Sequence, residues 1–381
     1  MNRLKIVHVQ VIPKLSGAQL FSLSLLSALP SELYEKYVIF SDRELVGPKQ
    51  KEEIISRFSD AGVSIIWLSS LQREIGLHDV RCFLDLYAIF KQYNFDIVHT
   101  NSTKPGILAR VAARIVGVKK VIHTVHGIAY HANLSIFKRL FFYFIEVFST
   151  LFCHNNISVN KYYVRYYKWL PFVRTMTIYN GVDFHKLGKE YTVNLSNKKF
   201  DFSNKTAQLL FVGRLDEQKD PLTLLRACNL LKYKYKCKFK MSIVGDGELL
   251  SECHSYCQNN NLLNEVKFHG WVSPPYRLYS EADVFVSSSI YEAFGFTLVE
   301  AAYYGLPIVA TNVEGIPEVV QDNLMGYLVD PKSPAELASA LNKILSDQRK
   351  LYQFSVSAHD SVVSRFSLEK MVANYRDVYE K

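Results

Sequence analysis

Two glutamates lie eight positions apart in the segment SSSIYEAFGFTLVEAAYYGLPIVAT, residues 287–311. Glu292 follows an apolar run that predicts a buried strand, and Glu300 lies within the helix predicted next. A carboxylate can accept hydrogen bonds from two neighbouring hydroxyls, which suits the vicinal diols of a hexose or a ribose. The turn between them would offer the free amides of a helix N-terminus to phosphate oxygens. One glutamate could therefore hold a ribose and the other a hexose. A solvated loop residue and a helix-surface residue are the alternative interpretation.

Candidate ligand-binding residues also follow three other apolar runs of the second half. Arg214 and Lys219, in FVGRLDEQKDP, are two cations that suit a diphosphate. Gly245, in VGDG, would let a ligand approach the backbone. The backbone at Val272, in FHGWVS, could hydrogen-bond a flat base. The ordinary alternatives are an exposed salt-bridged loop for Arg214 and Lys219, a tight turn for Gly245, and a core aromatic for FHGWVS.

The first half carries two further candidates at predicted strand ends. Gly17 lies in a loop of small residues after the first apolar run, where a ligand could come close to the backbone. His126 directly precedes Gly127 at the end of HTVHG, in the region where parallel strands expose their carboxyl ends. A single histidine is usually structural, and only its position favours a role for His126.

The elements that must position these residues form an alternating pattern. Seven short Val- and Ile-rich runs in the first half and six in the second are separated by segments with helical spacing. Near-continuous apolar runs are typical of parallel strands covered by helices on both faces, so the pattern predicts an α/β doubly wound fold. The polar stretch 187–206 predicts a connection between two domains. We expect domains over residues 1–186 and 187–365, with a terminal helix over 366–381.

Composition narrows the class of protein further. A chain of 381 residues exceeds one ordinary core, and 49% hydrophobic with 21% charged residues is typical of globular proteins. The six cysteines form no paired ligand framework, which favours a reduced, cytoplasmic protein. The N-terminal residues resemble a strand and not a signal peptide. The apolar run at 140–153 is too short for a membrane span and contains Glu146, so it predicts a buried or interfacial helix.

Positive charge is concentrated in one aromatic segment. The net charge is +9, and the segment from Lys104 to Lys186 holds twelve lysines and arginines against two acids. Basic residues among aromatic ones suit an anionic membrane surface, an anionic acceptor or single-stranded nucleic acid. We expect peripheral association with a membrane, although about half of these aromatics could simply belong to the core.

These motifs together resemble the family-4 retaining glycosyltransferases of the GT-B fold, in which two Rossmann-like domains face each other across a cleft. The resemblance rests on FVGRLDEQKDP, GDG, EAFGFTLVEAAYYGLPIVAT, GIPEVV, TVHG and YNGVD, in the family's order over nearly the whole chain. It implies a nucleotide-sugar donor, with Arg214 and Lys219 on the diphosphate and Glu300 on the ribose. Glu292 would contact the donor sugar and His126 would face it. The segment implied to run along the sugar and the phosphates is Phe294, Gly295 and Phe296.

The chain departs from the family pattern at two loops. Gly17-Ala18 stands where the family often has two adjacent glycines, and Glu314-Gly315 where it often has Gly-Gly. The first change could tighten the contact near the diphosphate, and the role of Glu314 stays open. Neither change removes a candidate catalytic group.

The resemblance also implies the chemistry of the reaction. We expect a UDP sugar as substrate, no cofactor and no metal, because no DxD-like acidic cluster appears in these motifs. The acceptor would be a lipid-linked or growing glycan of a bacterial surface polysaccharide such as lipopolysaccharide, reached from the inner face of the cytoplasmic membrane. The base, the sugar, the linkage and the oligomeric state cannot be assigned from the residues. Alternatives are a GT-B nucleotide-sugar epimerase, a phosphorylase, an inactive relative, or a basic nucleic-acid- or membrane-binding protein without catalysis.

Overall fold

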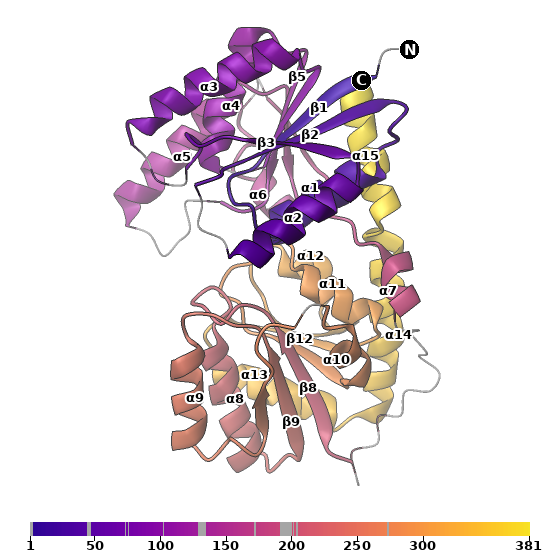
Figure 1. The fold of residues 1–381 in the computed structure, drawn as a ribbon. Helices are drawn as coiled ribbons and strands as arrows, with labels where there is room; N and C mark the ends of the chain where they lie inside the picture. The colour runs from indigo at the N-terminus through magenta and orange to yellow at the C-terminus, as the bar shows by residue number, and fades with distance from the viewer. Residues whose placement is uncertain are drawn as a thin grey trace. The chain divides into compact units, whose positions relative to one another are not determined.

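The computed structural model describes residues 3–43, 47–72, 74, 76–101, 103–128, 135–170, 173–190, 200, 202, 205–272 and 274–381 (Figure 1). The chain divides into two compact units. Unit 1 comprises Met1–Gly181 with Leu368–Lys381, and unit 2 comprises Val182–Ser367. The sequence-based division placed the boundaries after residues 186 and 365. Most of the expected connection at 187–206 lies outside the described residues, and its beginning belongs to a helix, α7 (Phe184–Glu190).

Unit 1 is built on a seven-stranded sheet in the order β3-β2-β1-β4-β5-β6-β7, and all neighbouring strands are parallel. The order reverses between β1 and β4, as in doubly wound folds. The strands are β1 (Leu4–Val9), β2 (Tyr34–Phe40), β3 (Val63–Trp67), β4 (Ile97–Thr100), β5 (Lys120–Val125), β6 (Asn155–Ser158) and β7 (Arg174–Thr177).

Helices connect these strands and cover the sheet, as parallel crossovers require. They bury apolar side chains in two clusters, one that includes Phe21 and Val38 and one that includes Val98 and Phe90. The helices are α1 (Gly17–Ala28), α2 (Pro48–Asp60), α3 (His78–Tyr93), α4 (Thr103–Val116), α5 (Ile136–Thr150), α6 (Lys161–Val164) and the terminal α15 (Leu368–Glu380).

Unit 2 repeats the architecture with a six-stranded parallel sheet in the order β10-β9-β8-β11-β12-β13. Here the order reverses between β8 and β11. The strands are β8 (Ala207–Val212), β9 (Phe239–Val244), β10 (Val266–Phe268), β11 (Val284–Ser287), β12 (Ile308–Thr311) and β13 (Gly326–Val329).

The helices of unit 2 enclose a core that runs from Leu209 through Val286 to Phe354. Asp220 caps α8 with its carboxylate, which accepts the amide of Thr223 at 3.2 Å, and Pro221 occupies the first helical position. In addition to α7, the helices are α8 (Pro221–Tyr233), α9 (Leu250–Asn259), α10 (Tyr276–Glu281), α11 (Phe296–Tyr303), α12 (Ile316–Val319), α13 (Pro334–Leu345) and α14 (Gln348–Arg365).

The structure confirms the predicted fold class. Each of the seven and six apolar runs overlaps one strand, and segments with helical spacing between them form helices such as α8 and α13. All six cysteines are free. Among the described residues, no helix is both long and apolar enough to cross a bilayer.

Candidate functional site

Three candidates of the second half lie at the switch point of the unit 2 sheet. Arg214 and Lys219 follow β8, and Glu292 follows β11, which is the neighbour of β8. Because the strands are parallel, both loops leave the sheet at the same edge. Ligands of open α/β sheets bind outside this edge, where the strand order reverses.

Hydrogen bonds join the two loops into one platform. The Ser288 hydroxyl donates to the carbonyls of both Lys219 and Asp220, each at 2.8 Å. The amide of Ile290 donates to the Gln218 carbonyl at 2.8 Å. These bonds fix the backbone on both sides of Lys219, so its side chain starts from a defined position.

Lys219 and Glu292 form an ion pair across the switch point, from Nζ to Oε2. Both side chains are largely buried, with exposed fractions of 17% and 14%. The carbonyl of Glu292 also accepts the amide of Gly315 at 2.9 Å, which ties it to the turn before α12. Glu314, in the same turn, adopts a left-handed conformation with φ 41°. A cation and a carboxylate therefore stand side by side, as neighbouring phosphate and hydroxyl groups of one ligand would require.

Arg214 lies on the same loop in a more open setting. Its guanidinium contacts Asp216 at 3.0 Å and donates to Gln218 Oε1 at 2.7 Å, while 59% of the side chain stays exposed. Its exposed N–H groups can still meet an anion, since guanidinium presents five donors.

The turn before α11 presents backbone rather than side chains. Gly295 has φ 82°, and a Cβ there would lie 2.7 Å from a methyl carbon of Leu298. The ring of Phe294 is buried against Phe296 and Phe366, with centroids 5.3 Å away in each case. The first amide of α11 that bonds back is that of Leu298, to the Gly295 carbonyl at 3.0 Å. The two preceding amides, those of Phe296 and Thr297, form the N-terminus of the helix, where an anion is stabilised.

Glu300 lies within α11 in a different environment. Its Oε2 accepts the hydroxyl of Tyr279 at 3.0 Å, and Tyr279 is fully buried and stacked on Tyr304. Desolvation by the surrounding protein raises the pKa of Glu300 to about 7, although the hydrogen bond from Tyr279 opposes the rise. Glu300 stays partly exposed, so a ligand hydroxyl can still reach it.

Close backbone packing explains the glycines after β9. The amide of Gly245 donates to the Gly270 carbonyl at 2.8 Å, so it is not available to a ligand. A Cβ on Gly245 would lie 1.9 Å from the Gly213 carbonyl oxygen. Gly245 thus lets two strand ends approach next to Arg214. Val272 is 37% exposed at the end of the loop after β10.

The candidates of unit 1 lie at the carboxyl edge of its own sheet. Gly17 is the exposed first residue of α1. One turn later, the Phe21 ring packs edge-on against the ring of His126, with centroids 4.6 Å apart. His126 Nε2 is 3.1 Å from Asn101 Oδ1, which follows β4. Burial lowers the pKa of His126 to about 3, so the ring is neutral near pH 7.

Tyr279 orients Glu300 through one hydrogen bond, but an aromatic on a short helix carries no distinctive sequence pattern and was not predicted. Asn101 lies at a predicted strand end, but the sequence does not pair it with His126. In the part of the chain that the structure describes, no three His, Cys, Asp or Glu side chains gather as metal ligands.

Comparison with known proteins identifies the family. The model of "Glycosyltransferase Family 4" matches residues 15–186, and that of "Glycosyl transferases group 1" matches residues 194–359. A UDP-Gal:alpha-D-GlcNAc-diphosphoundecaprenol alpha-1,3-galactosyltransferase of Escherichia coli is 30% identical over 398 residues, covering 99% of this chain and 97% of the relative. The chain belongs to the family-4 glycosyltransferases, as its motifs predicted, and it is a glycosyltransferase.

Further relatives agree with this assignment. The O-antigen biosynthesis glycosyltransferase WclY of Escherichia coli is 25% identical, with 75% of this chain and 79% of the relative covered. Anabaena Alr3699/HepE, solved in complex with UDP-glucose, has a TM-score of 0.79 at 19% identity and covers 99% of this chain and 100% of its own. A glycosyltransferase from Rickettsia africae reaches 0.78 at 20% identity, covering 100% and 98%. The fold is GT-B.

Proposed function

We propose that this glycosyltransferase moves a hexose or an N-acetylhexosamine from a UDP sugar to a lipid-linked glycan, with retention of the anomeric configuration and without a metal ion or a cofactor. The observation that carries the proposal is the pairing of Lys219 with Glu292 at the switch point of unit 2. A nucleotide sugar needs both a cation for its diphosphate and an acceptor for its hydroxyls within one short distance.

Each candidate takes a distinct role in this proposal. Arg214 and Lys219 hold the diphosphate together with the first amides of α11, around Gly295 and Phe296. Glu292 accepts hydroxyls of the transferred sugar, and Glu300 accepts those of the ribose. Phe294 acts through its buried ring, which holds the turn in place, rather than through contact with the sugar.

Four further residues complete the proposed sites. The backbone at Val272 meets the base, and Gly245 keeps that loop close to Arg214. In unit 1, Gly17 gives an open backbone at the start of α1. His126 contributes a neutral imidazole whose Nε2–H donates to Asn101 Oδ1, so its Nδ1 can accept one hydrogen bond from a hydroxyl without adding charge.

The donor and the acceptor are inferred from the Escherichia coli relative. That protein is named for transferring galactose from UDP-Gal to GlcNAc-diphosphoundecaprenol, and the similarity extends over nearly the full length of both chains. UDP-galactose and a polyprenyl-diphosphate-linked sugar are therefore the first substrates to test. Such an acceptor would place the enzyme at the inner face of the cytoplasmic membrane.

The proposed mechanism needs no enzyme nucleophile. The bond between the anomeric carbon and the diphosphate oxygen breaks as the acceptor hydroxyl attacks from the same face of the sugar. The leaving diphosphate oxygen takes the proton of that hydroxyl, so charge and atoms balance. Arg214, Lys219 and the helix amides stabilise the negative charge that grows on the diphosphate. An epimerase would instead need a base placed to remove the proton from the carbon that is inverted.

The test is transfer by the purified protein from UDP-galactose to a soluble analogue of GlcNAc-diphosphoundecaprenol, with the product anomer determined by NMR. Arg214→Ala and Lys219→Ala should each lower kcat/KM by roughly 10², as expected when charge stabilisation of a leaving group is lost. Lys232→Ala is the matched control, because Lys232 also pairs with a glutamate, Glu265, at 2.9 Å in unit 2.

Activity should also survive an excess of EDTA. Loss with EDTA that magnesium or manganese restores would contradict metal independence, and an inverted product anomer would contradict retention. Wild-type activity in a folded Arg214→Ala/Lys219→Ala double variant would contradict the proposed diphosphate site.

A further inference from the structure

Helix α5 exposes a continuous apolar row to solvent. Phe137 is 83% exposed, and Phe141, Phe144 and Phe148 are 56%, 60% and 59% exposed. These positions are three or four residues apart and share one face of a helix. The exposed row, which we call the α5 face, consists of Phe137, Leu140, Phe141, Phe144, Phe148 and Leu151 at the helix end. A contiguous apolar surface of this kind marks an interaction site.

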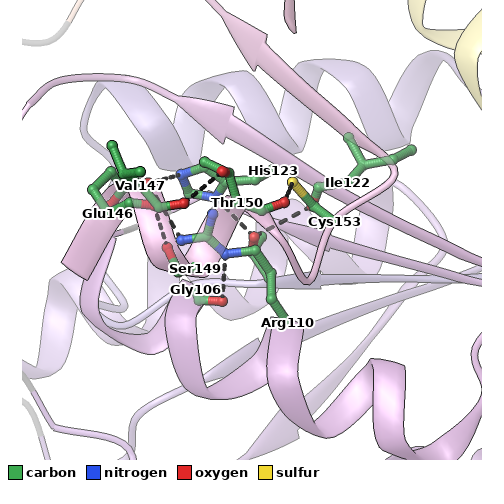
Figure 2. Close-up of polar contacts among 10 residues, drawn as sticks. Gly106, Arg110, Ile122, His123, Glu146, Val147, Ser149, Thr150 and Cys153 are labelled. Atoms are coloured by element: carbon green, nitrogen blue, oxygen red, sulfur yellow. Dashed lines mark hydrogen bonds and ion pairs between the residues drawn. The ribbon is translucent and has the colours of Figure 1, made fainter. Parts of the chain in front are cut away.

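The opposite side of α5 carries a buried glutamate. Glu146 is the one acidic residue of the helix and is buried. It contacts Arg110 of α4 at 3.3 Å and His123 of β5 at 3.4 Å (Figure 2). Ser149 and Thr150 are buried with it. At about 100° per residue, Glu146 projects roughly opposite to Phe144.

This buried cluster fixes the rotation of the helix about its axis. Arg110 is fully buried and also donates from Nε to the Gly106 carbonyl at 2.9 Å. His123 is held by Thr100 at 2.8 Å. Burial raises the pKa of Glu146, and the guanidinium of Arg110 opposes that rise. Turning the α5 face inward would expel Glu146 and leave Arg110 buried without its partner, which is strongly unfavourable.

The chain segment that contains α5 is cationic. Between residues 135 and 170 the chain has five lysines and arginines, and its single acid is the buried Glu146. Every one of these cations except Arg139 is exposed. The five are Lys138, Arg139, Lys161, Arg165 and Lys168.

An exposed tryptophan contacts α5. Trp169 is 58% exposed, and its indole donates to the hydroxyl of Tyr143 on α5 at 2.7 Å. That hydroxyl in turn donates to the Tyr166 carbonyl at 3.1 Å. Tryptophan and tyrosine with one apolar and one polar end are the residues that prefer a membrane–water interface.

We propose that the α5 face, held outward by Glu146, inserts into the headgroup region of an anionic lipid bilayer, with α5 parallel to the surface. A helix with phenylalanines and leucines on one side and lysines and arginines around them binds such a surface through both burial and charge. A second copy of the chain is a poorer occupant, because it would bring two cationic rims together. The inference rests on the proposed lipid-linked acceptor, since such an acceptor requires an enzyme at a membrane.

The experiment measures sedimentation of the full chain with phosphatidylcholine vesicles that contain a minority of phosphatidylglycerol. Phe144→Ser/Phe148→Ser should weaken partitioning about tenfold or more, because two phenylalanines leave the apolar phase. The control is Val80→Ser/Leu84→Ser on α3, where two apolar residues are 64% and 58% exposed in the same unit. The control should bind as the wild type does. Salt, or pure phosphatidylcholine, should weaken binding of the wild type.

A second measurement needs no change in the α5 face. Brominated lipids should quench the fluorescence of Trp169, and the quenching should be lost in Trp169→Phe. Equal thermal midpoints and equal UDP affinity would show that the variants are folded. Failure of UDP binding with intact vesicle binding would overturn the proposed function and leave this inference standing.

Three results would overturn the inference. The first is wild-type vesicle binding by Phe144→Ser/Phe148→Ser. The second is an equal loss in the α3 control. The third is a wild-type protein that does not bind vesicles but forms a dimer, which Phe144→Ser/Phe148→Ser dissociates. The α5 face would then be covered by a second copy of the chain.

Discussion

Glu292 is paired with a cation, whereas Glu300 is paired with a neutral hydroxyl. The ion pair with Lys219 keeps Glu292 beside the proposed diphosphate position. Burial raises the pKa of Glu300 to about 7, and the hydrogen bond from the Tyr279 hydroxyl opposes that rise. Two carboxylates eight residues apart thus have different partners, and their variants should fail in different ways.

Substitution of each glutamate by glutamine separates the two proposed roles. Glu300→Gln should weaken binding of both UDP and the full donor, because charge-assisted hydrogen bonds from ribose hydroxyls are worth about 1.5–3 kcal/mol each. Glu292→Gln should leave UDP affinity nearly unchanged and lower kcat with the donor, because the reacting carbon is no longer positioned. Calorimetric titration with UDP, together with donor kinetics, measures both. Equal loss of UDP affinity in the two variants would refute the separation.

The raised pKa of Glu300 also predicts how stability depends on pH. Its pKa is about 7 in the folded protein against an ordinary 4.5, so folding favours the protonated form. That contribution is fully present below about pH 4.5 and is lost as the pH rises through 7. Glutamine cannot ionise, so the Tm of Glu300→Gln relative to the wild type should increase between pH 5 and pH 8.

Thermal unfolding of both proteins without ligand across that range provides the measurement. Glu252→Gln, at an exposed position of α9, controls for general effects of removing one acid. A Tm difference for Glu300→Gln that stays constant with pH would show that the carboxyl is ionised throughout.

The sequence places Glu292, Arg214 and Lys219 at strand ends and Glu300 in the following helix, because apolar runs and glycines mark where strands stop. It could not pair Lys219 with Glu292, since that contact depends on β8 and β11 being neighbours. It could not find Tyr279 either. Its partner Glu300 is 21 residues away, and the contact exists only once α10 and α11 pack together.

At the scale of elements, the end of β9 can approach the loop after β8 only because Gly245 has no side chain. Gly245 has φ 137°, and a Cβ there would overlap the Gly213 carbonyl, which immediately precedes Arg214. The amide of Gly213 also bonds to the Val244 carbonyl at 2.9 Å. The two strand ends can therefore move apart only by displacing the arginine.

Gly245→Ala should therefore lower both stability and UDP affinity. A contact of 1.9 Å must be relieved by a backbone shift, and such strain typically costs about 1–3 kcal/mol. Gly326→Ala is the control, because its Cβ would lie 1.7 Å from the Ile308 carbonyl in the same unit, at a strand without a proposed ligand contact. Urea unfolding and UDP titration of both variants distinguish a local from a general effect. Unchanged UDP affinity in Gly245→Ala would separate this glycine from the site.

Helix α5 shows where an element can be predicted and its orientation cannot. The apolar run at 140–153 predicted a buried or interfacial helix, and the structure has a helix at Ile136–Thr150 whose phenylalanines are largely exposed. An ordinary amphipathic helix would turn its phenylalanines inward and Glu146 outward. The reverse arrangement depends on Arg110 and His123, which lie 36 and 23 residues away and become partners of Glu146 only in the fold.

At the scale of the whole molecule, the chain leaves unit 1 after Gly181 and re-enters it with α15. Tyr379 of that helix contacts two buried histidines, His99 at 2.7 Å and His8 at 3.2 Å. Tyr375 shares a 3.0 Å hydrogen bond with Thr124. Burial lowers the pKa of His8 to about 3, so its ring stays neutral and needs a neutral partner. The last helix thus satisfies polar groups in the centre of the first sheet.

Tyr379→Phe should destabilise unit 1 by about 1–3 kcal/mol, because two buried ring nitrogens lose one partner. Hydrogen exchange should show the loss in β1 and β4 and not in unit 2. Tyr352→Phe, at an exposed position on α14, should be neutral. Unaltered exchange in β1 and β4 of Tyr379→Phe would mean that the hydroxyl is dispensable.

The return of the chain to unit 1 sets an order for events during synthesis. A ribosome makes Tyr375 and Tyr379 only after every residue of Val182–Ser367 has been translated. The nascent sheet of unit 1 must therefore wait for the tyrosine hydroxyls that contact His8, His99 and Thr124. Unit 1 can therefore reach its final state only after all of unit 2 has been translated, although its sheet is made first.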